Sequence, residues 1–357
     1  MQLQTAVRKR MKNYAVYVVG NYERIAIYEL TAILETYNIQ YKIVRKFPQV
    51  LFIKADEQFE NIFYKRFAFS HFLIEIMDYF DIFDIKTLNI QLNGFLKDHI
   101  ITQHKDVSLI VKKIGQTMHP ITRQKLFITI KDMLEKKIGQ KLTFKNPKLT
   151  YVCILTLNTF ILGFLVKTSA RKDVLKRGPK YRPYNHPATL PSDLSRAMVN
   201  IAHLKQQDTL LDPFCGVGTV VIEGCTSDVY SVGMDIDKKM IFKALKNAEY
   251  FNCRNYSFIL GNTLKMPIKG SKNLAIVTDP PYGRAASTKG TKIYQLYSDF
   301  LENASSILRK DRFLVFISPH YLPISKILEK NDFKVVKKFY VRYHSKLTRV
   351  INVTLPG

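Results

Sequence analysis

The sequence predicts an α/β protein: a doubly wound sheet with an antiparallel edge hairpin forms the second half, and smaller α+β units precede it. Two observations carry this prediction. From residue 186 onward, short apolar runs alternate with segments of helical periodicity, which is typical of a parallel sheet covered by helices. Before residue 167, strands and helices follow each other in two smaller blocks. The 357 residues suffice for two or three domains.

The first 80 residues alternate between apolar strands and helical segments, which predicts a ferredoxin-like domain over residues 1–80. In the first helical segment, Ile27, Leu30, Ile33 and Leu34 share one face, as in a helix that packs on a sheet. The predicted strands are 14–20, 50–54 and 70–77, and the predicted helices are 23–37 and 59–67.

A second block covers residues 81–167. We expect a strand at 107–113, a long amphipathic helix at 122–138 and a strand pair within 148–166 that turns at Asn158 and Thr159. The apolar run 151–166 is too short and too often interrupted by polar residues to span a bilayer. The sequence therefore predicts no membrane association.

Residues 168–185 break the pattern and are predicted to form an exposed basic linker. Tyr181 and Tyr184 lie among its charges, and aromatic rings beside cations suit RNA bases and phosphates. A merely solvated run of charge is the alternative. The candidate RNA-binding residues of this linker are Arg171, Lys172, Lys176, Arg177, Lys180 and Arg182.

Residues 186–357 carry the alternation that predicts the doubly wound sheet. Its last two strands are joined by a short turn, which predicts the antiparallel hairpin at one edge. The predicted strands are 209–211, 229–234, 257–260, 274–278, 312–318, 333–343 and 349–355, and the predicted helices are 194–202, 219–225, 238–252 and 294–308.

The charge of the chain points to a polyanionic partner. Its formal net charge is +26, with 46% hydrophobic residues, so nucleic acid is the first candidate. The four cysteines show no paired spacing, and the histidines are scattered. These patterns argue against a metal site or a disulfide framework and favour a reducing cytoplasm.

The motif Asp279-Pro280-Pro281-Tyr282 follows a predicted apolar strand and is the candidate catalytic site. The two prolines stiffen a loop that holds a carboxylate and an aromatic ring in fixed relation. Asp279 and the Pro280 carbonyl could accept the two N–H bonds of an amine on a planar base, while Tyr282 stacks on the ring. Such acceptors help a conjugated amine to attack an electrophile. A simple strand-terminating turn is the alternative.

Three other strand ends carry residues that suit a nucleoside cofactor, because parallel sheets bind ligands beyond the carboxyl ends of their strands. An acid that precedes the two-glycine loop would repel a pyrophosphate but could hold a cationic amino acid, which favours S-adenosylmethionine over NAD. Asp235 suits the ribose hydroxyls, Ile236 an adenine face and Asn262 the adenine amine. The remaining candidate cofactor-binding residues are Asp212, Phe214, Cys215, Gly216, Gly218, Thr219 and Thr263.

These residues resemble a known family. The segments DPFCGVGT, MDID and TDPPYGRAAS, with the upstream run RGPKYRPYNHPATLPSDLSRAMVNIA, look like the archaeal tRNA guanosine-10 N2-methyltransferases. Residues 107–166 resemble a THUMP domain, a tRNA-binding module. The resemblance implies a Rossmann-like class I methyltransferase domain at 186–357, preceded by ferredoxin-like and THUMP domains.

The resemblance implies transfer of one or two methyl groups from S-adenosylmethionine to N2 of a guanosine in tRNA. The protein is expected to be a monomer. Arg284 could bind a phosphate or the base edge. Asn262 departs from the family, because many relatives carry Asp there. The alternatives are guanosine 6 of tRNA, an adenine-N6 methyltransferase, or an RNA-binding protein without catalysis.

Overall fold

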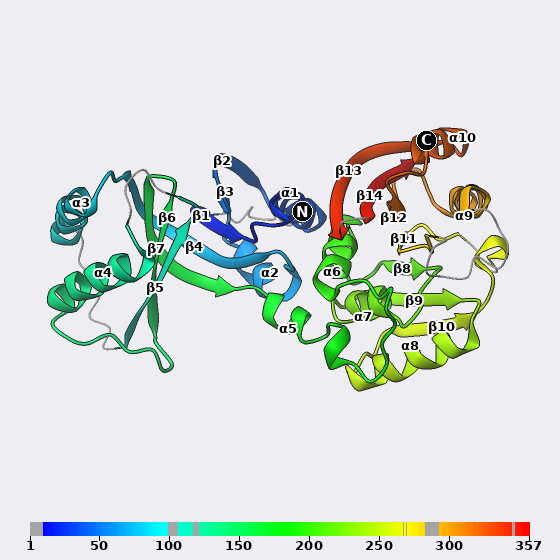
Figure 1. The fold of residues 1–357 in the computed structure, drawn as a ribbon, viewed down its shortest axis with the longest axis horizontal. Coiled ribbons are helices and arrows are strands. Elements are labelled where there is room, and N and C mark those ends of the chain that lie inside the picture. Colours follow the sequence, from blue (N-terminus) through cyan, green and yellow to red (C-terminus); the bar gives the residue numbers. More distant parts are fainter. Residues whose placement is uncertain are drawn as a thin grey trace, which may run out of the picture. The chain divides into compact units, whose positions relative to one another are not determined.

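The computed structural model describes residues 10–98, 106–116, 121–266, 268, 270–282, 293–344 and 347–357. The chain divides into two compact units (Figure 1). The second unit contains 24–38, 65–69 and 170–357, and the first contains the remaining residues up to 169. The two units interleave along the sequence, whereas the predicted domains are continuous segments. The predicted domain boundaries therefore stay a prediction.

The first unit is built on one seven-stranded sheet with the order β2-β3-β1-β4-β7-β6-β5. Only β5 and β6 pair in parallel; the other neighbours are antiparallel. The strands are β1 (Met11–Val18), β2 (Tyr41–Phe47), β3 (Val50–Asp56), β4 (Ser70–Asp81), β5 (Val107–Ile114), β6 (Leu149–Thr156) and β7 (Thr159–Thr168).

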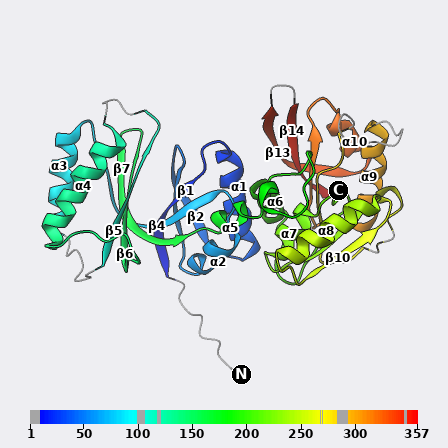
Figure 2. The ribbon, with the colours of Figure 1, turned by 60° about the horizontal axis from the view of Figure 1, so that its bottom comes forward.

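Apolar residues cover both faces of this sheet, because alternate residues of a strand point to opposite sides. In β6, Tyr151 and Cys153 pack with α3 (Ile85–Asp98) and α4 (Arg123–Ile138), whereas Val152 and Ile154 pack with residues of β1, β3 and β4. The two helices lie side by side along this end of the sheet (Figure 2).

The boundaries of α4 follow from local chemistry. The Thr122 hydroxyl accepts a hydrogen bond from Lys125 N at 3.1 Å, and Gly139 ends the helix with a φ of 70°. A hydroxyl cap and a left-handed glycine are the ordinary signals for the two ends of a helix. Within one residue, this is the predicted helix.

Three predictions for the first unit were incomplete. The sequence analysis missed β2, an edge strand whose lysines and arginine hide its alternation, and α3, because residues 81–106 were not assigned. The turn between β6 and β7 lies at Leu157 and Asn158, one residue earlier than predicted, with a φ of 53° at Leu157.

The second unit contains the predicted doubly wound sheet, in the order β10-β9-β8-β11-β12-β14-β13. The strands from β10 to β12 are parallel, and β14 runs antiparallel to both of its neighbours, so the predicted edge hairpin is confirmed. The strands are β8 (Thr209–Asp212), β9 (Tyr230–Asp235), β10 (Tyr256–Leu260), β11 (Leu274–Thr278), β12 (Leu314–Pro319), β13 (Phe333–His344) and β14 (Leu347–Pro356).

Helices of the second unit cover this sheet. The side chains of α9 and α10 form one core with β8, β11 and β12. On the other side, α7 packs between α6 and α8 and against β8 and β9, and α8 packs against β9 and β10 (Figure 1). The prediction missed α10. The helices are α6 (Ser192–Ile201), α7 (Thr219–Cys225), α8 (Lys238–Tyr250), α9 (Ile293–Ile307) and α10 (Ile324–Lys330).

The second unit also includes most of α1 (Glu23–Thr36) and the end of α2 (Phe59–Arg66). Fully buried Glu29 accepts hydrogen bonds from the backbone N–H groups of Ala68 and Phe69 and from the Asn200 amide. Arg66 donates to Asn200 at 3.0 Å. These charge-assisted bonds satisfy polar groups that would be costly to bury alone, and they attach both segments to α6.

The segment after β7 is more ordered than predicted. It contains a short helix, α5 (Arg171–Leu175), and a 3₁₀ turn, η1 (Pro179–Tyr181), instead of an irregular linker. Three of its arginines pack into the second unit, as described below. The prediction of an exposed basic linker was therefore wrong for these arginines.

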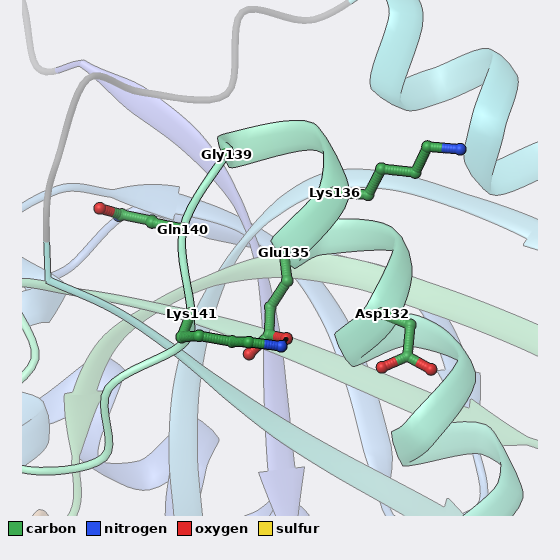
Figure 3. A pocket seen from close by; sticks show the side chains of 6 residues that line it. All are labelled: Asp132, Glu135, Lys136, Gly139, Gln140 and Lys141. Carbon is green, nitrogen blue, oxygen red and sulfur yellow. Dashed lines mark hydrogen bonds and ion pairs between the residues drawn. The ribbon is translucent and has the colours of Figure 1, made fainter.

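One open hollow of about 500 Å³ lies at the end of α4 (Figure 3). Lys141 extends along Glu135 at 3.1 Å, while Asp132 and Lys136 point away from them. None of the predicted site residues lines this hollow, so it contributes nothing to the candidate site. Among the described helices, none has the length and apolar content needed to cross a membrane.

Candidate active site

The predicted site residues follow the carboxyl ends of neighbouring parallel strands. Asp212 ends β8, Asp235 ends β9, and Asp279 follows β11. In the sheet, β8 lies between β9 and β11, so these ends come to one edge. This edge is where open α/β sheets bind ligands.

The two-glycine loop turns sharply between β8 and α7. Cys215 N donates to Met234 O at 2.9 Å, which holds the loop against the end of β9. Gly216 and Gly218 have φ values of 50° and 86°, a region that favours glycine. A Cβ on Gly218 would also lie 3.1 Å from the Ala244 Cβ. The loop therefore needs glycine for both conformation and packing.

Asp235 is fixed by backbone donors. One carboxylate oxygen accepts from Gly216 N and the other from Asp237 N, each at 2.9 Å. Burial raises the pKa of Asp235, and these hydrogen bonds oppose that change. The neighbouring Ile236 side chain is exposed, which leaves an apolar surface beside the carboxylate.

Asp212 is buried below the glycine loop. Its carboxylate accepts a hydrogen bond from the Thr278 hydroxyl at 2.6 Å and one from Phe214 N at 3.3 Å. Burial raises the pKa of Asp212 to about 7, although both hydrogen bonds lower it. Thr278, to which the sequence analysis gave no role, directly precedes Asp279, so this hydrogen bond connects Asp212 to the start of the predicted catalytic loop.

The third strand end connects to the first. The Asn262 side chain accepts from Leu264 N at 3.0 Å and so caps the turn η2 (Thr263–Lys265). The Thr263 hydroxyl donates to Pro213 O. An adenine amine that binds Asn262 would therefore donate to a side-chain oxygen that already accepts a hydrogen bond from Leu264 N.

Cys215 is a packing residue. Its side chain is buried, and burial raises the pKa of its thiol well above the ordinary value. A thiol with a raised pKa is not a nucleophile at neutral pH.

The predicted catalytic motif is held by a contact within itself and by contacts from two other segments. The Tyr282 hydroxyl donates to the Asp279 carboxylate, and Tyr321, after β12, donates to Tyr282 O at 2.9 Å. Arg349, on β14, lies 3.6 Å from the second Asp279 oxygen, and its guanidinium carbon lies 5.0 Å from the centroid of the Tyr282 ring. Pro280 is buried and Pro281 half-buried.

Asp279 combines burial with a nearby cation. Its side chain is 14% exposed. Burial raises the pKa of Asp279 to about 7, while the positive charge of Arg349 lowers it. A carboxyl group that titrates near neutrality can accept a proton from a substrate and release it.

The arginines of the predicted RNA-binding segment are engaged within the second unit. Arg177 binds both carboxylate oxygens of Glu223 at 2.8 Å. Arg182 donates to the Thr219 hydroxyl at 2.7 Å, and Arg171 lies 3.2 Å from Asp193. Lys172, Lys176 and Lys180 are exposed. The lysines, not the arginines, are thus the surface cations of this segment. Arg284 lies outside the described residues.

Sequence reasoning missed Arg349 and Asn247. It made Arg349 the first residue of a predicted edge strand and gave it no role, whereas its side chain is only 3% exposed. Asn247 donates to Val217 O at 3.0 Å and to Tyr184 O at 2.9 Å, so it links the glycine loop to the basic segment. A single arginine at the start of the apolar run that forms β14 was the available signal for Arg349.

Two family models match the chain. One, described as the RMKL-like methyltransferase domain, matches residues 179–349 and therefore contains the glycine loop, Asp279 and Arg349. The other, described as a DNA methylase, matches residues 36–246 and ends before Asp279.

Several curated relatives are similar over long segments. The tRNA (guanine(10)-N2)-dimethyltransferase of Methanothermobacter thermautotrophicus is 28% identical, covering 91% of this chain and 94% of its own length. A probable tRNA (guanine(10)-N2)-dimethyltransferase of Methanothermococcus thermolithotrophicus is 33% identical, covering 45% and 96% respectively. The tRNA (guanine(6)-N2)-methyltransferase of Methanocaldococcus jannaschii is 27% identical, covering 62% and 67%.

Solved structures share the fold. TrmN from Thermus thermophilus is 16% identical with a TM-score of 0.60, covering 98% of this chain and 100% of that one. SMU.472, solved in complex with SAH, is 14% identical with a TM-score of 0.57, covering 98% and 99%. These likenesses support the methyltransferase fold of the second unit. The relative at 33% identity, of which this chain covers 96%, shows that the chain belongs to the family of the tRNA (guanine(10)-N2)-dimethyltransferases.

Proposed function

We propose that this protein transfers methyl groups from S-adenosylmethionine to the exocyclic N2 of a guanosine in tRNA, with position 10 as the target. The observation that carries the proposal is the loop in which Asp279, Pro280 and Tyr282 stand beside the glycine loop at one sheet edge. The names of the relatives supply the substrate: several act on guanine 10 of tRNA and carry the term dimethyltransferase.

The residues of the second unit suit S-adenosylmethionine. The carboxylate of Asp235 and the exposed side chain of Ile236 stand together, as ribose hydroxyls and an adenine face require. Buried Asp212 would repel a pyrophosphate and favours a cationic amino acid moiety. When bound, the cofactor supplies an electrophilic methyl group carried on sulfur.

The chain's own residues prepare the target amine. The Asp279 carboxylate and the Pro280 carbonyl accept its two N–H bonds, while the Tyr282 ring stacks on the guanine. Because the pKa of Asp279 is about 7, its carboxylate can take the proton that the amine loses. In the structure the Tyr282 hydroxyl donates to the Asp279 carboxylate. The amine must therefore share this carboxylate with the hydroxyl or displace the hydroxyl from it. The base must leave its stack to reach this loop.

Residues of the first half support tRNA binding. The order β1-α1-β2-β3-α2-β4, with the strand order β2-β3-β1-β4, agrees with the predicted ferredoxin-like domain. The prediction of a THUMP domain after it rests on the sequence resemblance, and relatives include a U6 snRNA (guanine-N(2))-methyltransferase named THUMPD2. The exposed lysines Lys172, Lys176 and Lys180 are proposed phosphate contacts. A cytoplasmic monomer belongs to the same proposal.

Methyl transfer to an unmodified tRNA transcript tests the proposal. We expect incorporation from labelled S-adenosylmethionine, and the product nucleoside to be N2-methyl- or N2,N2-dimethylguanosine at position 10. Asp279→Ala should abolish transfer while tRNA binding stays at the wild-type level. Unchanged turnover in Asp279→Ala would refute the role of this loop.

A second candidate is methylation of guanosine 6, because two relatives carry that name. A third is adenine-N6 methylation, which shares the motif and which the DNA methylase model favours. Mapping the modified nucleotide separates all three. No transfer to any tRNA or DNA, with tRNA bound, would instead indicate an RNA-binding protein.

A further inference from the structure

One buried cation, Arg349, lies beside both functional side chains of the catalytic loop. Arg349 lies 3.6 Å from an Asp279 oxygen, and its guanidinium carbon is 5.0 Å from the centroid of the Tyr282 ring. The strand position explains this placement, because Arg349 pairs with Pro319 at the carboxyl end of β12. The antiparallel hairpin thus returns a residue from near the chain's end to the edge where the loop lies.

We propose that Arg349 is the positioning residue of the Asp279–Tyr282 loop: one buried guanidinium group orients the Tyr282 ring from one face and supplies the positive charge that faces the Asp279 carboxylate. This inference rests on the proposed function for its catalytic consequence. It adds a residue that acts through Asp279 and Tyr282 rather than by touching the substrate.

The contact with the ring sets which face a base can use. Cations prefer the faces of aromatic rings, and here the guanidinium occupies one face of Tyr282. A guanine that stacks on Tyr282 must therefore use the opposite face. Since Tyr321 holds the backbone carbonyl of Tyr282 at 2.9 Å, the ring has a fixed side for its substrate.

The contact with the carboxylate sets its charge. Burial favours the neutral acid, and Arg349 is the cation that opposes it. The other described groups facing Asp279 are Tyr282 in its own loop, buried Asp212 at the end of β8, and Tyr297 on α9. Asp212 is acidic and the two tyrosines carry no charge at neutral pH, so none of the three replaces the positive charge.

The test measures the Asp279 carboxyl group directly. In protein labelled with ¹³C-aspartate, its titration is followed by NMR in the wild type, Arg349→Gln and Arg349→Lys, with Asp279→Asn to assign the signal. We expect the midpoint of Asp279 in Arg349→Gln to rise by at least about one pH unit, since an opposite charge at this distance lowers a carboxyl pKa by that amount. In Arg349→Lys, which keeps the charge, it should stay near the wild-type value.

Turnover provides the second readout. If the pKa of Asp279 rises by one unit from about 7, roughly a tenth of this carboxyl group is ionised at pH 7 instead of half. Arg349→Gln should thus lose about fivefold in kcat at pH 7 and recover most of it at pH 9. Arg349→Lys should keep the pH profile but raise KM for tRNA, because its compact ammonium cannot stack on Tyr282 as a planar group does.

An Asp279 midpoint that is the same in Arg349→Gln as in the wild type would overturn the inference, as would a loss of kcat that high pH does not reverse. If Arg349→Gln does not fold, Arg349→Lys decides: a raised Asp279 midpoint together with an unchanged KM for tRNA would contradict both roles. The titration needs no substrate. A wild type inactive on tRNA would therefore refute the proposed function without touching this inference.

Discussion

The Arg182 guanidinium donates a 2.7 Å hydrogen bond to the hydroxyl of Thr219, the first residue of α7. Thr219 directly follows Gly218, so the basic segment buttresses the loop that is proposed to hold the cofactor. Arg182 also donates to Arg177 O. The side chain predicted to bind RNA thus acts inside the protein.

Arg182→Lys should weaken binding of S-adenosylmethionine. Lysine cannot reach both acceptors, and a lost hydrogen bond to a charged group costs about 1.5–3 kcal/mol, part of which appears in cofactor affinity. We expect a rise of roughly tenfold in Kd by calorimetry, with unchanged tRNA affinity at fixed salt. Thr219→Val should have a similar effect, and the double variant should add little, because both changes remove one contact. Fully additive losses of affinity for S-adenosylmethionine would show that Arg182 and Thr219 do not act through one contact.

Glu223→Gln should destabilise the second unit strongly. Burial disfavours the charged form of Glu223, but Arg196 and Arg177 outweigh it and lower the pKa of this carboxyl. Both arginines contact the fully buried Glu223 at 2.8–2.9 Å. Removing the negative charge leaves buried cations uncompensated, which costs about 3–5 kcal/mol. Urea denaturation measures this loss.

The matched control is Asp173→Asn, whose partner Lys176 is exposed. Breaking such a surface pair should change the free energy of unfolding by less than about 1 kcal/mol. Equal effects of the two variants would show that burial does not decide the strength of these pairs.

Turnover should rise with pH through about 7. The pKa of Asp279 is raised by burial to about 7, so the carboxylate that accepts the amine proton is lost as pH falls below that value. At saturating cofactor and tRNA, kcat should fall about tenfold for each pH unit below 6 and be constant above 8. Burial also raises the pKa of Asp212 to about 7, so KM for S-adenosylmethionine should rise as the pH falls through the same range. A flat profile from pH 5 to 8 would exclude Asp279 as the acceptor.

The exposed lysines of the basic segment should carry part of the salt dependence of tRNA binding. Replacing Lys172, Lys176 and Lys180 by serine should weaken binding and reduce the slope of log K against log salt by roughly one per lost phosphate contact. The control changes Lys310, Lys326 and Lys330, which are also exposed and alter the net charge equally. An identical slope in both triple variants would assign the effect to net charge alone.

Local patterns predicted the parts of the site that depend on strand ends. Asp212, Asp235 and Asp279 were placed correctly because each stands directly after an apolar run, and the carboxyl ends of parallel strands meet at one edge. The boundaries of α7 and β11 were predicted to the residue for the same reason. In contrast, β2 was missed because its lysines and arginine hide the alternation of an edge strand, and α3 was missed because residues 81–106 were not assigned.

The sequence alone therefore determined the succession of strands in the second unit, the glycine loop and the position of Asp279 after β11, since these follow from residues adjacent in the chain. Only the tertiary structure decided which cations face inward. An arginine that binds phosphate and one that neutralises a buried carboxylate look alike in sequence. Arg177, Arg182 and Arg349 became internal because folding brought Glu223, Thr219 and Asp279, all distant in the sequence, within reach of their guanidinium groups.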